Sequence, residues 1–458
     1  MTSPESTSAP SLPGGLTSLT ALPWRGPVLA LAGTVVVGEG LTQWLHVDGG
    51  ALLGLGALAG GWWLLARRPR PTAKLPGDVD GWIQRCQEVL PRFAQLADAE
   101  NDNQMPRREA EFTALLSEIR RGELAASLVS CRPPAAALQP AFAAALRCSR
   151  PMRLQWGEPL PTASAHWSWS ESFAHSDLLL YHLHWPLSAA DLRWLEALPK
   201  GQPVWLLLQR PAEATADSLL ADLSSQWPDL EPQRCLLWDG DGASLAAALA
   251  PLADWLRRHG QRQRQQTAVR VLAQLHERWQ ADLEALRRGH FQRLQQRTQW
   301  LVAAGVLASP LPSLDLLVLA AANGLMLQEM ARLWDCSWDL ETLRAAAAEL
   351  ARAALALGVV EWSSQALLAA TKLHGATWLV GGALQALSAA YLTRVVGHAM
   401  ADVLALSSGV AEADLAAIRR QAPMLVSQAA EAERIDWNGF LNQGRQWLQQ
   451  SLGPAATA

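Results

Sequence analysis

Short apolar runs alternate with amphipathic stretches through the middle of the chain, over residues 122–260. The runs lie at residues 124–129, 178–183, 204–208 and 234–238. Apolar runs of this length are typical of buried parallel strands, and the stretches between them repeat apolar residues at helical spacing. The pattern predicts a doubly wound α/β domain, in which Leu128, Leu180 and Leu207 lie side by side in one parallel sheet.

The segments on either side of this domain are helical in pattern. Residues 68–121 combine a Pro-rich linker with two helices, separated by a polar break at residues 98–108. Residues 261–298 predict a basic amphipathic connecting helix, in a stretch with ten Arg and three acidic residues between Arg257 and Arg297. Such a helix can bind RNA, lie on anionic lipid or pack on the flanking domains. Its continuation into an apolar segment favours lipid over RNA, and packing on the domains is an equal alternative.

The C-terminal part, residues 299–452, is helical and apolar, and we expect it to be membrane-associated. Residues 373–400 are long enough to span a bilayer. Asp315, Arg394 and His398 argue against a clean lipid-facing span. They favour helices that insert partly or pack on one another.

The N-terminal part predicts a membrane anchor. Residues 1–24 are rich in Ser, Thr, Pro and Gly, which predicts disorder. Two apolar segments within residues 25–67 predict a transmembrane helical hairpin, with a buried soluble hairpin as the alternative. Glu39 is expected to face the partner helix or the lipid headgroups. Four basic residues follow between Arg67 and Lys74, so we expect an integral membrane protein with its main soluble domain on the cytoplasmic side.

The amino-acid composition limits the classes of partner and of cysteine chemistry that the chain can have. Half of the 458 residues are apolar and 17% are charged, which suggests membrane contact, and the net charge of −4 gives no support for nucleic-acid binding. The five Cys are scattered and form no CxxC pair, which indicates reduced thiols rather than disulfides or a zinc site. The 22 Trp are interpreted as a compositional bias, with interfacial anchoring as a minor alternative.

The loop after the first strand lacks the residues that bind phosphate. A phosphate-binding loop needs G-x-x-x-x-G-K-[ST], whereas residues 131–138 read CRPPAAAL. Two prolines remove two N–H donors, and Arg132 is interpreted as a surface residue. His182 and His184 lie two apart on one strand face, which can suit a metal, but no third ligand is in register. We therefore expect no catalytic, cofactor-binding or metal-binding residues and no cofactor.

Two parts of the chain resemble known families. Residues 309–315 (SPLPSLD) with Gln328, Met330 and Ala331, and then residues 371–373, Gly375 and residues 389–397, resemble a domain of unknown function found in YcjF-type inner-membrane proteins. That domain also occurs attached to Era-like GTPase domains. YcjF-type proteins carry an N-terminal pair of membrane helices, similar to the pair predicted here.

The middle of the chain, residues 124–259, looks like a decayed Era-like G domain. The guanine-reading Asn-Lys-x-Asp of that family is replaced by QRPA at residues 209–212. The Asp-x-x-Gly motif is missing near residues 167–171, and Asp239-Gly240 stands in place of a Ser-Ala element. These lost groups supply most of the charge stabilisation in phosphoryl transfer, so no catalytic residue is carried over.

These resemblances imply a non-catalytic, membrane-anchored protein whose pseudo-GTPase domain acts as a scaffold or partner-binding module at the cytoplasmic face. Membrane lipid is the expected partner, with a companion GTPase or self-association as further candidates and no nucleic acid. A divergent GTP-binding protein or GTPase is the first alternative. A membrane transport or channel component, suggested by the apolar helices with Glu39 and Asp315, is the second.

Overall fold

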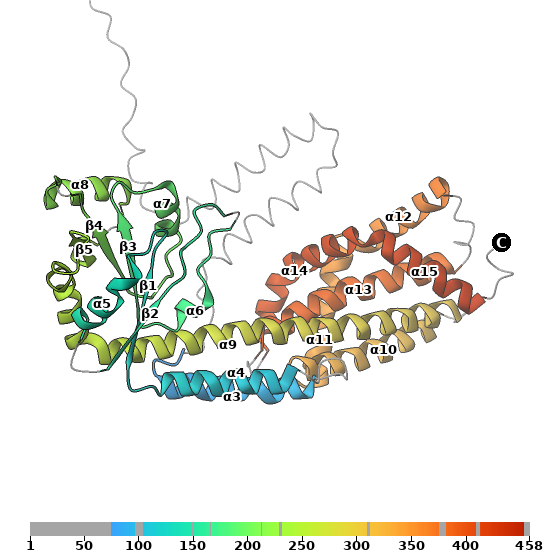
Figure 1. Cartoon of the computed structure of the whole chain (residues 1–458). Coiled ribbons are helices and arrows are strands. Elements are labelled where there is room, and N and C mark those ends of the chain that lie inside the picture. Colours follow the sequence, from blue (N-terminus) through green and yellow to red (C-terminus); the bar gives the residue numbers. More distant parts are fainter. Residues whose placement is uncertain are drawn as a thin grey trace, which may run out of the picture. The chain divides into compact units, whose positions relative to one another are not determined.

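The computed structural model describes residues 75–96, 104–147, 151–164, 166–211, 213–228, 231–308, 312–374, 382–408 and 413–452. They fall into two compact units, named here the middle unit (described residues up to 292) and the helical unit (described residues from 293). Helix α9, Leu245–Ala308, contributes residues to both units (Figure 1). The predicted disordered N-terminus at residues 1–24 and the predicted hairpin at residues 25–67 lie outside the described residues.

The middle unit contains a five-stranded sheet whose strands are all parallel. The strands are β1 (Leu124–Val129), β2 (Met152–Trp156), β3 (Leu178–His184), β4 (Val204–Gln209) and β5 (Cys235–Trp238), in the order β2-β1-β3-β4-β5. Leu128 lies opposite Leu180 in the register, and Leu207, on the neighbouring strand, belongs to the same buried cluster. The prediction that these three leucines share one parallel sheet is confirmed.

Helices cover both faces of this sheet, as in doubly wound α/β domains. They are α5 (Gln139–Ala145), α6 (Glu171–Ala174), α7 (Ala189–Glu196) and α8 (Ala216–Gln226), with short 3-10 turns η1 (Ala136–Leu138) and η2 (Pro232–Arg234). The first part of α9 and α5 bury one face through Leu249, Leu252 and Phe142. Helices α6, α7 and α8 bury the other face through Phe173, Trp194 and Leu223.

A second core of the middle unit lies beside the sheet, between α3 (Val79–Gln95), α4 (Gln104–Ile119) and the central part of α9. Leu272, Leu275 and Trp279 of α9 are buried there, and Trp279 packs against Phe93 and Phe112. The apolar stripe predicted for the basic connecting helix therefore packs on protein. This agrees with the packing alternative for residues 261–298, while the expected contact with membrane lipid stays a prediction.

The helical unit follows in the last part of α9 and in six further helices. These are α10 (Pro312–Leu333), α11 (Leu340–Ala356), α12 (Val359–His374), α13 (Ala383–Leu406), α14 (Leu415–Ile435) and α15 (Trp437–Leu452). Helix α13 packs against α11, α12 and α14, and most of its side chains are buried. Its Arg394 and His398 pair with Glu433 of α14, which is the packing of helix on helix that these polar residues predict.

Among the described helices, none combines the length and the apolar character needed to cross a bilayer. One strand of the sheet lies outside the predicted apolar runs. Strand β2 forms at Met152–Trp156, and the segment HWSWSES that comes later follows a loop and leads into α6. The alternating Met152, Leu154 and Trp156 are the period-two signal of a half-buried edge strand, and the burial of β2 is weaker than that of β1.

Candidate functional site

The carboxyl edge of the sheet is where a doubly wound domain normally binds its ligand. The crevice forms between neighbouring strands whose connections leave in opposite directions, which here are β1 and β3. The sequence therefore directs attention to the loop after β1, where Ser130, Cys131 and Arg132 lie, and to His182 and His184 at the end of β3.

Neutral hydrogen bonds close this crevice. Ser130 Oγ lies 2.7 Å from the His182 carbonyl oxygen and accepts from the Arg132 backbone N–H at 3.0 Å. His182 Nδ1 lies 3.1 Å from the Arg132 carbonyl oxygen, and a carbonyl only accepts, so Nδ1 carries the proton of the neutral ring. Burial, and then the neighbouring His184, lower the pKa of His182 to about 4. The ring is therefore neutral at pH 7.

The chain itself also covers the end of β1. Leu160, in the loop after β2, donates its backbone N–H to the Ser130 carbonyl oxygen at 2.8 Å. Gly157 donates in the same way to the Leu128 carbonyl oxygen, and a Cβ on Gly157 would lie 2.8 Å from that oxygen. Only glycine allows this close approach, so the chain after β2 stays paired with the end of β1 and uses the Leu128 and Ser130 carbonyl groups.

The residues that stand where a GTPase-like domain would carry its motifs make protein contacts of their own. Pro134 is buried and Arg132 is exposed, as expected for a surface arginine. Arg210 pairs with Asp239 across the ends of β4 and β5, and both side chains are about two-fifths exposed. Gln209 packs against Gly240, whose φ of +89° suits glycine. These contacts tie loops together at the positions where a GTPase would read its base.

The histidine pair does not gather a metal site within the described residues. The rings of His182 and His184 lie 4.5 Å apart, edge to face, and no group of three potential ligand side chains forms in the part of the chain that the structure describes. Burial lowers the pKa of His184 as well. Cys131, Cys86 and Cys235 are free thiols, and burial raises the pKa of each to about 11. None of these thiols is activated as a nucleophile.

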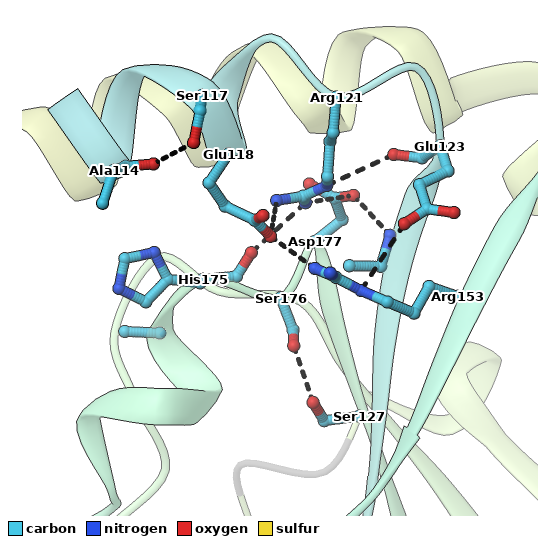
Figure 2. A network of polar contacts seen from close by, with 12 residues as sticks. Ala114, Ser117, Glu118, Arg121, Glu123, Ser127, Arg153, His175, Ser176 and Asp177 are labelled. Atoms are coloured by element: carbon cyan, nitrogen blue, oxygen red, sulfur yellow. Dashed lines mark hydrogen bonds and ion pairs between the residues drawn. The ribbon is translucent and has the colours of Figure 1, made fainter.

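The amino edge of the same sheet holds a charged network that was not predicted from the sequence (Figure 2). Asp177, fully buried just before β3, accepts from the Ala125 backbone N–H at 2.8 Å and from Arg121 Nη2 at 2.9 Å. Glu118 of α4 pairs with Arg121 and with Arg153 of β2. Arg270 of α9 donates to the carbonyl oxygens of Ala174 and Ser176. This network joins α4, the sheet and α9.

A cavity of about 790 Å³ opens beside that network. Helix α4, residues 169–175 and α9 form its walls, and the buried side chains of Leu115, Phe173, Val271 and Leu275 contribute apolar surface. His175 lines it too, and burial, opposed by Glu118, lowers the pKa of that ring. A second cavity of about 550 Å³ shares Glu111, Glu171 and Arg278 with the first. Cavities of this size accommodate drug-sized ligands or side chains of a partner.

Sequence reasoning missed this second location because its parts are far apart in the chain. Arg121 and Asp177 are 56 residues apart, and Arg278 and Glu111 are 167 residues apart. The available signal was the amphipathic pattern of α4, which places Glu111, Ala114 and Glu118 on one face at helical spacing.

A family model matches residues 270–431, and its description is a domain of unknown function (DUF697). The match begins within α9 and ends within α14, so it covers less than half of the chain. It agrees with the resemblance of the C-terminal part, since this is the C-terminal domain associated with YcjF-type and GTPase proteins. Searches of curated proteins and of solved structures gave no match. The likeness of the middle unit to an Era-like domain stays a prediction.

Proposed function

We propose that this chain is a non-catalytic, membrane-anchored protein whose middle unit is a degenerate GTPase-like domain that works as a scaffold or partner-binding module at the cytoplasmic face. The anchor rests on the sequence of residues 25–67. The domain of unknown function at residues 270–431 supports the association with YcjF-type and GTPase proteins.

The closed carboxyl edge is the observation that carries the non-catalytic part of the proposal. Phosphoryl transfer needs converging backbone N–H groups, a cation and a bound metal at that edge. Ser130 and His182 instead hold the loop after β1 down on the sheet, and the Ser130 carbonyl oxygen accepts from the Leu160 backbone N–H. Prolines at positions 133 and 134 cannot donate to a phosphate.

A nucleotide titration of the full chain in zwitterionic nanodiscs tests this proposal. We expect no saturable binding of fluorescent GTP, GDP or ATP at millimolar concentration with Mg²⁺, and no shift in the unfolding temperature. The full chain is required, because a fragment ending near residue 260 would lose Leu272, Leu275 and Trp279 from the α3–α4–α9 core. Saturable binding or turnover of GTP would overturn the proposal and favour the divergent GTPase.

A further inference from the structure

The two cavities on the amino side of the middle unit form one elongated groove, named here the α4–α9 groove. The side chains of α4 that line it come from positions 104, 107, 108, 111, 114, 115 and 118. This spacing of three and four is one face of a helix over about four turns, or about 20 Å. Positions 271, 274, 275, 278 and 282 of α9 form the facing wall. A groove of this length matches a helix better than a compact ligand.

The floor and the rim of the groove differ in polarity. Leu115, Phe173 and Leu275, each less than a tenth exposed, contribute apolar floor. The rim of the larger cavity carries Glu111, Glu118, Glu171 and Glu277, together with Arg278. An apolar floor between charged rims is the pattern of grooves that bind an amphipathic helix.

The charge on this rim selects the partner. Arg278 is shared between Glu111 and Glu171, the latter at 3.8 Å and with 88% of its side chain exposed. Glu118 turns toward Arg121 and Arg153 of the amino-edge network. Since burial lowers the pKa of His175, that ring adds no positive charge at pH 7. Since Arg121 and Arg153 neutralise Glu118, and Arg278 pairs with Glu111, the larger cavity keeps Glu171 and Glu277 as the carboxylates that attract basic side chains. The smaller cavity is lined by Arg107 and Arg108 beside Asp282, so the basic side chains of a partner are directed to the larger cavity.

We propose that the α4–α9 groove binds a basic amphipathic helix of a partner protein, with the apolar face of that helix on Leu115, Phe173 and Leu275 and its Lys or Arg side chains against Glu171 and Glu277. The inference rests on the proposed function, because it gives the partner-binding module its binding surface and the chemical class of its partner. It does not depend on the state of the carboxyl edge.

The test uses the full chain in zwitterionic nanodiscs and two synthetic helical peptides of about 14 residues. Both carry Leu along one face, and one has Lys on its flanks where the other has Glu. Fluorescence anisotropy of the labelled peptides, corrected with empty nanodiscs, measures the dissociation constant. The Lys peptide should bind saturably and the Glu peptide at least tenfold more weakly, with about two exposed ion pairs accounting for the factor.

Reversing the charge of the two groove carboxylates tests whether they bind the basic side chains of the peptide. Glu171→Lys together with Glu277→Lys should weaken the Lys peptide about tenfold or more and should improve binding of the Glu peptide. The matched control is Glu196→Lys with Glu213→Lys, which makes the same change in net charge at exposed positions of α7 and of the loop before α8. Equal effects of the two double variants would show non-specific attraction and would overturn the proposal.

Blocking the groove tests its position without changing charge. Ala114 is exposed and lines the larger cavity, so Ala114→Trp places a large side chain in the groove and leaves the buried core untouched. We expect at least a tenfold loss of Lys-peptide binding with an unchanged circular dichroism spectrum. Unchanged affinity in this variant contradicts the proposed site.

The two proposals fail in different ways. Saturable GTP binding by the full chain would remove the non-catalytic function and leave peptide binding as measured. Peptide binding that ignores charge reversal and Ala114→Trp, or saturation of a peptide on the nanodisc lipid alone, would remove the groove and leave the nucleotide result as measured.

Discussion

The two edges of the five-stranded sheet are held together by different chemistry. At the carboxyl edge, Ser130 and the neutral His182 fix the loop after β1 through hydrogen bonds to carbonyl groups. At the amino edge, the buried carboxylate of Asp177 meets Arg121, and Glu118 extends the network to β2 (Figure 2). Doubly wound domains usually bind ligands at the carboxyl edge. Here neutral hydrogen bonds hold the loop after β1 and the ion pair of Arg210 with Asp239 is exposed, while the buried ion pair of Asp177 and the two cavities lie at the amino edge.

The two edges differ in how far their polar groups are satisfied by the protein itself. A carboxyl edge that binds phosphate must leave backbone N–H groups and cations unsatisfied until the ligand arrives. The loop after β1 instead uses its polar groups on the protein itself, as the Ser130 and Arg132 contacts show. The amino edge has strong internal pairs close to the sheet and exposed carboxylates such as Glu171 farther out. The inner amino edge is therefore held by buried charge, and its rim carries the exposed carboxylates that the proposed partner helix would meet.

Of the substitutions considered, the removal of the Asp177 carboxylate should lower the free energy of unfolding the most. Its carboxylate is 1% exposed and holds Arg121 and the Ala125 N–H, so Asp177→Ala removes the buried partner of a mostly buried guanidinium and leaves it only the more exposed Glu118. Breaking a buried pair in this way costs about 3–5 kcal/mol. Urea unfolding of the middle unit, followed by tryptophan fluorescence, measures the loss. A change below about 1 kcal/mol would mean that water reaches this edge and that the two edges do not differ as described.

The pattern of apolar residues was sufficient to predict the sheet. Strands β1, β3 and β4 lie within one residue of the predicted runs, because parallel strands buried on both faces need apolar residues at every position. Strand β2 lies at the edge and alternates, so its five residues gave a weaker signal.

The continuity of α9 was not predicted. The sequence predicts that the α/β domain ends at residue 260 and that a connecting helix begins at residue 261. In the structure Gly260 lies inside α9 and close to Leu124, where a Cβ would be only 2.8 Å from that side chain. This glycine allows the helix to approach β1 and does not end it. Tertiary packing therefore outweighs the low helix propensity of glycine at this position.

The two edges could be predicted to different degrees. The loss of phosphate-binding chemistry was visible in residues 131–138, because that chemistry depends on a short local motif. The pairing of Asp177 with Arg121 was not visible, because it depends on the end of α4 reaching the start of β3. Charged residues that look like ordinary surface positions in sequence acquire their role only through the tertiary fold.

Protonation of His182 should cause the next largest loss in the free energy of unfolding. It tests the hydrogen bonds that hold the carboxyl edge. The folded-state pKa is about 4 and the ordinary value is 6.5, so the unfolded chain binds more protons between these values. The contribution of His182 is therefore complete above about pH 6.5 and is lost as the pH falls toward 4. The shift corresponds to about 3 kcal/mol of unfolding free energy.

A variant separates this contribution from those of other histidines. Burial also lowers the pKa values of His175, His184 and His276, so each makes the middle unit less stable in acid. His182→Gln keeps a donor for the Arg132 carbonyl oxygen and cannot be protonated. Urea titrations at pH 7 and near pH 4 should show a smaller acid loss for the variant than for the natural chain. Equal losses would mean that water or a counter-charge reaches the ring at the carboxyl edge.

Substituting one glycine at each edge compares how much backbone strain and side-chain packing contribute to the free energy of unfolding. Gly240, at the carboxyl edge, has φ of +89° and a Cβ there would collide with the Gln209 amide. Gly201, at the amino edge, has φ of +78° and nothing within 4 Å of its Cβ position. Gly201→Ala should therefore cost about 1 kcal/mol from the backbone alone. Gly240→Ala should cost more because Gln209 must move. Equal costs in urea unfolding would show that the loop of Gly240 is not packed against β4.

The smallest effect is expected for Arg210→Ala. Arg210 and Asp239 pair at the carboxyl edge with 38% and 43% of their side chains exposed, and exposed pairs contribute little because water and salt screen them. The midpoint of urea unfolding should stay unchanged within error, whereas Arg121→Ala at the amino edge should lower it clearly, since its partner Asp177 is buried. The substitution also removes a positive charge from the position where a GTPase would read its base. If Arg210→Ala destabilised the protein as much as Arg121→Ala, the carboxyl edge would depend on charge after all. The distinction between a carboxyl edge held by neutral hydrogen bonds and an amino edge held by a buried ion pair would then fail.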